Sequence, residues 1–175
     1  MIFHTIGHSS LTMENFLELL SAHGIEHLVD IRRFPMSRRY PQFSREFLKR
    51  ELGERRVGYT WVESLGGRRE YQSNTPHTGW SIEGFPAFAD HMETESFEKA
   101  MAGVMEIAGT QSVALMCAEA NVERCHRWLI ADWLYVRGIE VRHISATGPA
   151  VTHALTSFAR VEGTRIIYDG GQMNL

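Results

Sequence analysis

The stretch that decides the fold is "SVALMCAEANVERCHRWLIADWLYVRG", residues 112–138. It opens with a nearly unbroken apolar run that ends at Cys117, which is typical of a strand buried on both faces of a sheet. A polar loop follows, and we expect a helix from about Asn121 to Val136, with Gly138 as its stop signal. A buried strand, a polar loop and a helix together form the repeating unit of an α/β domain.

The rest of the chain repeats this alternation of strands and helices. Further strands are predicted at residues 2–6, 27–31, 57–61, 140–144 and 165–169. Further helices are predicted at residues 12–23, 44–52, 86–92, 96–108 and 150–160. Short strands separated by helices imply right-handed crossovers, so we predict a three-layer α/β sandwich with a mostly parallel central sheet. Residues 63–86, rich in Gly, Ser, Asn and Pro, are a candidate lid or binding loop.

The overall composition is that of an ordinary globular protein. The 175 residues are 43% apolar and 22% charged, so we expect one domain over residues 1–175. We expect no signal peptide, because the start lacks a basic segment followed by a long apolar stretch. No apolar run of about 18 residues is uninterrupted, so we also expect a cytoplasmic protein without a membrane partner. In a reducing compartment its two cysteines would be free, ligating or reactive.

The charge is unevenly distributed along the chain. The net charge is −3, yet residues 32–56 contain nine Lys or Arg against three Glu, a local charge of +6. This basic segment also contains Phe34, Tyr40 and Phe43, a combination suited to phosphates and stacked bases. The partner would then be an anionic small molecule or a nucleic acid. The alternative is a solvated surface whose aromatic residues anchor the loop to the core.

Polar residues follow most of the predicted strands. In parallel α/β sheets ligands bind outside the carboxyl ends of the strands, so these residues are expected to share one edge. They are His8, Ser9, Ser10, Asp30, Arg32, Arg33, Trp61, Glu63, Cys117, Glu119, His143 and Ser145.

Cys117 is the candidate nucleophile, provided that something lowers the pKa of its thiol. The positive end of the helix expected near Asn121, or the guanidinium of Arg124 or Arg127, could do so. The alternative is an inert buried side chain. Cys125, which is expected within the helix, is the weaker candidate nucleophile.

Carboxylates and histidines near the same edge suggest general acid and base chemistry. The predicted catalytic residues are Cys117, Glu119, His8, Asp30 and His126. The predicted substrate-binding residues are Ser9, Arg32, Arg33, Ser37, Arg38, Gly66, Gly67, Arg68 and Arg127. Gly66 and Gly67 would form the flexible part of a closing clamp. A structural alternative is that Asp30 pairs with an arginine and Glu119 accepts amide hydrogen bonds.

A metal site is the weaker alternative for the same residues. Cys117, Cys125 and His126 could ligate an ion, with His8 as a fourth ligand. Neighbouring residues on a helix point about 100° apart, however, so Cys125 and His126 should not both reach one ion. Structural zinc sites usually space paired ligands differently. We therefore predict no metal site, and a divalent metal stays an alternative. No cofactor motif is visible, and the absence of a dinucleotide fingerprint argues against a nicotinamide enzyme.

The ordered motifs "TIGHS", "LVDIRRFPMSRRYPQF", "LGGRRE", "LMCAEANVERCHR", "IADWL" and "VRHI" resemble the domain-of-unknown-function 488 family over residues 5–144. The resemblance implies a compact Rossmann-like α/β domain from a bacterial or archaeal cytoplasm, and it implies no settled activity. The characteristic polar positions of the family fall on His8, Ser9, Asp30, Arg32, Pro35, Ser37, Gly66, Gly67, Cys117, Glu119, Cys125, His126 and Arg127.

Three hypotheses for the function follow. The first is an enzyme that acts on an anionic substrate, a nucleotide or nucleic acid, by hydrolysis or group transfer. The second is a non-catalytic nucleic-acid-binding module that uses the basic segment. The third is a metal-binding hydrolase or redox protein.

Overall fold

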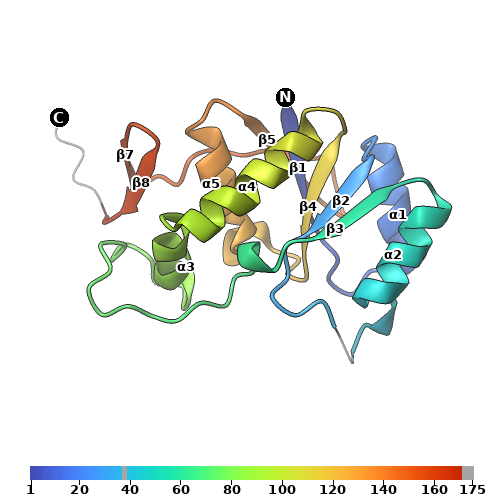
Figure 1. The fold of residues 1–175 in the computed structure, drawn as a ribbon, viewed down its shortest axis with the longest axis horizontal. Helices are drawn as coiled ribbons and strands as arrows, with labels where there is room; N and C mark the ends of the chain where they lie inside the picture. Colours follow the sequence, from blue (N-terminus) through green and yellow to red (C-terminus); the bar gives the residue numbers. More distant parts are fainter. Residues whose placement is uncertain (37–38, 171–175) are drawn as a thin grey trace.

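The computed structural model describes residues 1–36 and 39–170 and has a Rossmann-like α/β architecture (Figure 1). Six strands form the main sheet in the order β3-β2-β4-β1-β5-β6, and all neighbours are parallel except β5 and β6. The mostly parallel sheet predicted from the sequence is therefore confirmed. Its strands are β1 (Ile2–Gly7), β2 (His27–Asp30), β3 (Gly58–Trp61), β4 (Val113–Cys117), β5 (Glu140–Ile144) and β6 (Val151–Thr152).

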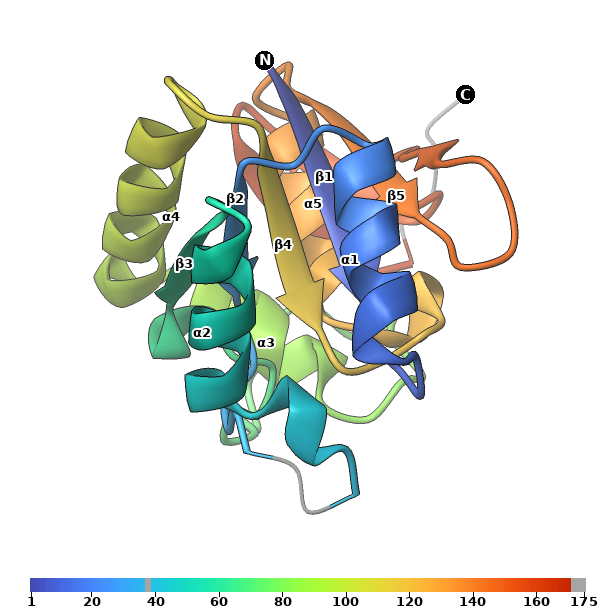
Figure 2. The same ribbon diagram turned by 90° about the vertical axis from the view of Figure 1, so that its right-hand side faces the viewer.

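Helices cover both faces of this sheet (Figure 2). One face packs against α1 and α2, and the other packs against α3, α4 and α5. Each layer contributes its own apolar cluster, as expected for a three-layer sandwich. The helices are α1 (Met13–Ala22), α2 (Arg45–Glu54), α3 (Phe85–Met92), α4 (Glu95–Ala108) and α5 (Arg127–Tyr135).

The unbroken apolar run of β4 reflects burial on both sides. Val113 and Leu115 pack into the cluster formed with α3, α4 and α5. Ala114 and Met116 face the opposite cluster, formed with α1 and α2. Side chains alternate between the two faces of a strand, so a central strand covered on both faces needs apolar residues at every position. All four side chains are fully buried.

The ends of α1 follow the signals in the sequence. The hydroxyl of Thr12 accepts a hydrogen bond from the backbone N–H of Asn15 at 3.1 Å and so caps the first turn. After the helix, Gly24 has a φ of 62°, a left-handed conformation that glycine adopts without steric cost. Both expectations for this helix are confirmed.

The helix predicted at residues 150–160 is wrong. Val151 and Thr152 instead form β6, which pairs antiparallel with β5, and the backbone N–H of His153 donates to the carbonyl of Val141 at 2.8 Å. The chain then forms a hairpin of β7 (Ala159–Glu162) and β8 (Arg165–Tyr168). The last predicted strand therefore exists, but it lies in this hairpin and not in the main sheet.

The carboxylate of Asp132 on α5 explains this departure. Asp132 is fully buried and accepts hydrogen bonds from His153 Nε2 at 2.8 Å, from the Thr156 hydroxyl at 2.6 Å and from the Tyr168 hydroxyl at 2.9 Å. It also accepts the backbone N–H of Thr156 at 3.0 Å. A buried carboxylate must be satisfied by donors, and the extended chain around residues 153–156 supplies them.

The long segment after β3 packs against the rest of the molecule. It begins with a 3₁₀ turn, η2 (Glu63–Leu65), and continues without regular structure to α3. Arg69 donates to the carbonyl of Ser64 at 2.5 Å, and the Trp80 ring lies 4.7 Å from that of Phe158 and 5.3 Å from that of Tyr168. The hydrogen bond of Arg69 lies within the segment, whereas the ring contacts of Trp80 connect the segment to Phe158 and to Tyr168 of β8. Separately, none of the helices in residues 1–36 and 39–170 has the length and apolarity needed to span a bilayer.

Replacing Asp132 with Ala should lower the free energy of unfolding by at least about 3 kcal/mol, because several buried donors would lose their acceptor at once. Urea denaturation followed by circular dichroism measures this loss. The exposed Glu162→Ala serves as the control and should change stability by less than about 0.5 kcal/mol. A loss below about 1 kcal/mol for Asp132→Ala would contradict the importance of this carboxylate.

Candidate functional site

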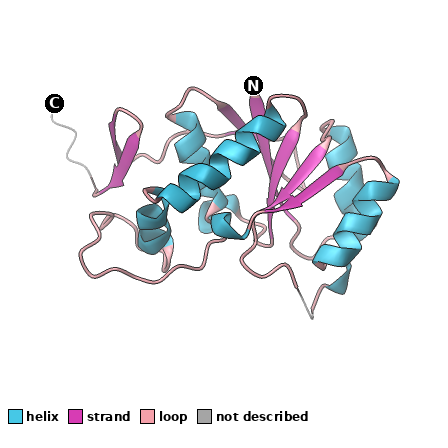
Figure 3. Cartoon of the chain, viewed as in Figure 1, coloured by secondary structure: helices cyan, strands magenta, loops and turns pink. Residues whose placement is uncertain are grey.

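The carboxyl ends of β1, β2 and β4 meet at one edge of the sheet, where each strand runs into a loop (Figure 3). Backbone hydrogen bonds continue past the strands: His8 N–H donates to the carbonyl of Cys117 at 2.9 Å, and Ile31 N–H donates to that of Met116 at 3.0 Å. His8 and Cys117 therefore lie at the same edge, as the sequence predicts. Asp30 ends the neighbouring strand β2.

Asp30 and Arg32 form a buried, bidentate ion pair. Arg32 donates from Nη2 to Oδ2 of Asp30 at 2.6 Å and from Nε to Oδ1 at 2.9 Å. Asp30 also accepts from the hydroxyl of Tyr59 at 2.7 Å. Burial, followed by the neighbouring Asp30, raises the pKa of Tyr59 well above its usual value, so this hydroxyl keeps its proton. The catalytic role of Asp30 stays a prediction; in the structure both of its oxygens accept hydrogen bonds from protein donors.

His8 is held as a neutral imidazole. Its Nε2 lies 3.2 Å from Nη1 of Arg32, which can only donate, so Nδ1 carries the proton and donates to the carbonyl of Ser9 at 3.0 Å. Burial, and then the charge of Arg32, lowers the pKa of His8 to about 4. The ring also stacks on Phe43 with 4.2 Å between centroids. Both ring nitrogens of His8 therefore have protein partners, and the catalytic role of His8 stays a prediction.

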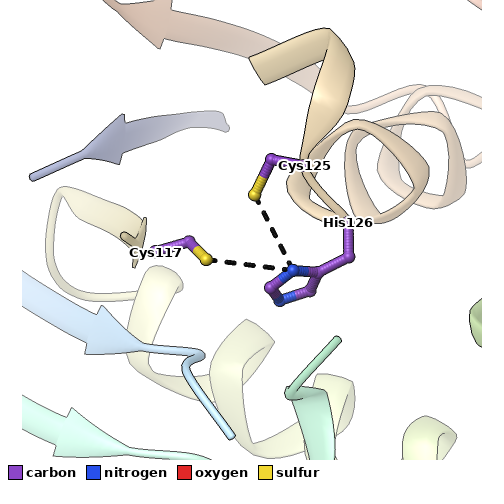
Figure 4. Close-up of side chains that lie close together, drawn as sticks. All are labelled: Cys117, Cys125 and His126. Carbon is purple, nitrogen blue, oxygen red and sulfur yellow. Dashed lines mark hydrogen bonds between the residues drawn. The ribbon is translucent and has the colours of Figure 1, made fainter. Parts of the chain in front are cut away.

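The two cysteines and His126 come together at this edge (Figure 4). His126 Nδ1 lies 3.7 Å from Sγ of Cys125 and 3.9 Å from Sγ of Cys117. The helix was expected to start near Asn121, but α5 starts only at Arg127, after a 3₁₀ turn, η3 (Val122–Arg124). Cys125 has an extended backbone with φ −123° and ψ 142° between the two. Cys125 and His126 are therefore not successive helix residues, and both side chains can face one point.

The two thiols differ in acidity. Burial alone would raise the pKa of Cys125, but the hydrogen bond from Cys117, the neighbouring His126 and Arg127 lower it well below the usual value. The hydrogen bond with Cys125 and then burial raise the pKa of Cys117. From the sequence, Cys117 is the candidate nucleophile on the condition that its pKa is lowered, whereas in the structure the thiol with the lowered pKa is that of Cys125. The two shifts have opposite directions because the thiol of Cys117 donates a hydrogen bond to the sulfur of Cys125.

Arg127 is buried beneath this cluster and binds protein groups. Its Nη2 donates to the backbone carbonyl of Glu119 at 2.5 Å, and its Nε donates to Sγ of Cys125 at 3.3 Å. Substrate binding by Arg127 stays a prediction; in the structure its guanidinium contacts the loop carbonyl of Glu119 and Sγ of Cys125. The carboxylate of Glu119 is exposed and accepts the backbone N–H of Asn121 at 3.0 Å. This carboxylate therefore remains accessible at the edge.

A cavity of about 430 Å³ opens over the cluster. We call it the arginine pocket, because four arginines and only two glutamates contribute to its walls. A second cavity of about 370 Å³ shares the Arg32, Phe34 and Met36 walls and extends to His8 and Ser9. Charged and reactive residues of the arginine pocket are Arg32, Arg33, Arg68, Arg124, Glu83, Glu119, Cys117, Cys125 and His126.

The two glycines of the predicted clamp serve close packing. A Cβ on Gly66 would lie 2.7 Å from Cα of Arg33, and one on Gly67 would lie 2.6 Å from Nδ1 of His126. Neither position has room for a side chain. Gly67 thus lets the segment after β3 lie directly on the imidazole of His126.

Most of the predicted site residues lie around the two cavities. Ser37 and Arg38 lie outside the described residues. Sequence reasoning missed Tyr59 as a partner of Asp30, because that contact depends on the register between β2 and β3. It also missed Arg124 as a pocket wall, because η3 was read as the start of a helix.

Histidine 8 should stay neutral down to about pH 4, and NMR titration of its ring protons measures this directly. Between about pH 6.5 and about pH 4, His8 binds a proton in the unfolded chain but not in the folded chain. His8 therefore lowers the free energy of unfolding as the pH falls through this range. His8→Gln should weaken this acid sensitivity. A ring that titrates near pH 6.5 in the folded protein would contradict the buried contact with Arg32.

Comparison with known proteins gives one result. The sequence model of one family, described as Domain of unknown function DUF488, matches residues 12–134. That segment includes β2, β4 and the Cys/Cys/His cluster, whereas His8 lies just outside it. No curated protein and no solved structure matches the chain significantly.

Proposed function

Because the chain belongs to the domain-of-unknown-function 488 family, whose description names no activity, we propose a function from the site itself. The protein is an enzyme that acts on an anionic substrate, a nucleotide or nucleic acid, by hydrolysis or group transfer. The observation that carries this proposal is the arginine pocket, whose floor contains Cys117, Cys125 and His126. Positive walls would bind the substrate's charge, and the cluster would meet the reacting atom.

The charge of the pocket favours an anion. Among the described residues, neither Arg68 nor Arg124 forms an ion pair with a carboxylate. Arg33 pairs with Glu63 at 3.1 Å while both side chains remain partly exposed. A concave surface lined by one sign of charge raises the local concentration of the opposite ion. Arginine also binds phosphate oxygens with two parallel hydrogen bonds.

Two exposed apolar side chains favour a nucleotide over a small inorganic anion. Phe34 is 65% exposed and Met36 is 82% exposed, and both lie on the walls of the two cavities. Exposed aromatic rings beside arginines are the combination that stacks bases while phosphates bind nearby. The Cys/Cys/His cluster would then face the sugar or the phosphate of a nucleotide that stacks on Phe34.

The reacting groups are the accessible ones. Cys117 and Glu119 both contribute to the arginine pocket, and Glu119 has an exposed carboxylate that suits proton transfer. Asp30, His8 and Arg127 are engaged by protein groups and act by positioning the others. In this proposal, side chains at the pocket surface react with the substrate, and the buried side chains beneath them hold the reacting groups in position.

The alternative is a non-catalytic nucleic-acid-binding module. The local charge of +6 over residues 32–56 and the exposed Phe34 favour it. Such a module needs neither the thiols nor the carboxylate of Glu119. The two functions are therefore separated by variants that change reactive atoms but leave the binding surface intact.

Cys117→Ser and Glu119→Gln should each abolish turnover, by at least about 100-fold, while ligand binding stays within about 3-fold. Serine keeps a donor toward Cys125, and glutamine keeps the acceptor for the Asn121 N–H, so both variants should fold. A panel of nucleotides and short oligonucleotides is assayed for product by chromatography and for binding by calorimetry. Binding with no product from the unsubstituted protein, in every case, would favour the module.

Arg68→Ala and Arg124→Ala should each weaken binding of the anionic ligand by about 10-fold, the cost of one hydrogen-bonded charge contact. For a nucleic-acid ligand, affinity should fall as salt rises, and each variant should flatten this dependence by roughly one unit of logarithmic slope. Arg160→Ala, in the β7–β8 hairpin, is the matched control and should bind normally. Unchanged binding in both pocket variants would argue against the arginine pocket as the binding surface.

A further inference from the structure

The Cys/Cys/His cluster has the chemical composition of a metal site. Two sulfurs and one imidazole nitrogen lie within 4.8 Å of one another. They come from the end of β4 and from the turn that precedes α5. Figure 4 shows the three side chains pointing toward one another. The sequence argued against a metal because Cys125 and His126 were expected on one helix, and the extended backbone at Cys125 removes that objection.

The distances fit tetrahedral coordination. With Zn–S of about 2.3 Å and Zn–N of about 2.0–2.1 Å, the sulfur and nitrogen ligands of a tetrahedral site lie about 3.6 Å apart. His126 Nδ1 lies 3.7 Å from one sulfur and 3.9 Å from the other. Binding an ion would therefore require shifts of only a few tenths of an ångström along these two edges.

The imidazole of His126 is already oriented for a metal. Its Nε2 lies 3.2 Å from the carbonyl oxygen of Ile31, which can only accept, so Nε2 carries the proton and Nδ1 keeps its lone pair. Metal-binding histidines commonly donate their second N–H in this way. That lone pair can accept a hydrogen bond from only one thiol, whereas a bound cation would satisfy the nitrogen and both sulfurs together.

The surroundings also suit two thiolates. Nε of Arg127 donates to Sγ of Cys125 at 3.3 Å, a charge-assisted contact that stabilises a sulfur anion. Two thiolates would neutralise a divalent cation, so no net charge would be added to the buried layer. Because Arg127 also holds the carbonyl of Glu119, the loop between the two cysteines is kept in place.

We propose that Cys117, Cys125 and His126 bind one zinc ion, with its fourth coordination position open to the arginine pocket. This inference rests on the proposed function, because it names the group that an anionic substrate would meet there. Sulfur and imidazole ligands select zinc over calcium or magnesium, which prefer oxygen. Three protein ligands with one open position are the arrangement of catalytic zinc, which acts as a Lewis acid on a phosphoryl or carbonyl oxygen.

The fourth position belongs to the pocket. Within residues 1–36 and 39–170, no further cysteine, histidine or carboxylate joins the three ligands. His8, the fourth ligand considered from sequence, accepts a hydrogen bond from Arg32 instead. All three ligands contribute to the walls of the arginine pocket, so a substrate oxygen or water could reach the ion from that side.

The first experiment measures metal content. The protein is produced with zinc in the medium, purified under reducing conditions without chelators, and analysed by mass spectrometry of its metals. We expect one zinc per chain, and more than about 100-fold weaker zinc binding in Cys125→Ser and His126→Gln, since loss of an outer hydrogen-bond partner alone costs about 10–100-fold. His8→Gln, which lies outside the three ligands, is the matched control and should retain its zinc.

The second experiment uses the unsubstituted protein and so does not depend on how the variants fold. After chelation, titration with Co²⁺ should give a thiolate-to-cobalt charge-transfer band and the strong visible absorption of tetrahedral cobalt, saturating at one equivalent. Protein without zinc that also gives no such band would overturn the inference. Metal-free protein that still turns over a nucleotide would overturn it too and leave the proposed function standing. Zinc-loaded protein with no turnover on any substrate of the panel would contradict the proposed function alone.

Discussion

The parallel register of β1, β2 and β4 is the constraint on which the site depends. Cys117 lies opposite Gly7, and Met116 lies opposite Asp30, so three separate segments end at the same level. Hydrogen bonds then continue past the strands and fix the first loop residues, His8 and Ile31. Without this alignment, the thiol of Cys117 and the guanidinium of Arg32 would lie at different heights and could not line the same cavity.

The sequence contains a clear signal for β4 because this strand is buried on both faces of the sheet and is apolar throughout. The run at residues 113–116 is this signal, and the polar residues after each strand correctly mark the shared edge. The failure at residues 150–160 has a physical cause. The path of this segment is determined by hydrogen bonds to the buried carboxylate of Asp132. Asp132 lies on α5, so its effect leaves no periodic pattern in the sequence of residues 150–160.

The sequence predicted which residue types lie in the site, but not their hydrogen-bond partners or the shifts of their pKa values. Asp30, His8, Cys117 and His126 do gather at one edge, yet hydrogen bonds determine which of their polar atoms already have protein partners. Burial and then the charge of Arg32 lower the pKa of His8, and the hydrogen bond from Cys117, with His126 and Arg127 nearby, lowers the pKa of Cys125. Such differences depend on distances of a few ångströms between segments that are far apart in the chain.

Several orienting contacts of the site are made by main-chain oxygens. The carbonyl of Ile31 sets the tautomer of His126, and the carbonyl of Glu119 holds Arg127. All residue types have the same backbone carbonyl and differ only in their side chains. Substituting Ile31 or Glu119 therefore leaves the hydrogen-bond acceptor in place. A scan of point variants would therefore report the imidazole and the guanidinium but miss the two carbonyl oxygens that orient them, because any effect of substituting Ile31 or Glu119 would come from the side chain. Genetic screens will therefore undercount the groups that organise this edge, and only changes to the backbone itself, such as an ester in place of an amide, can expose them.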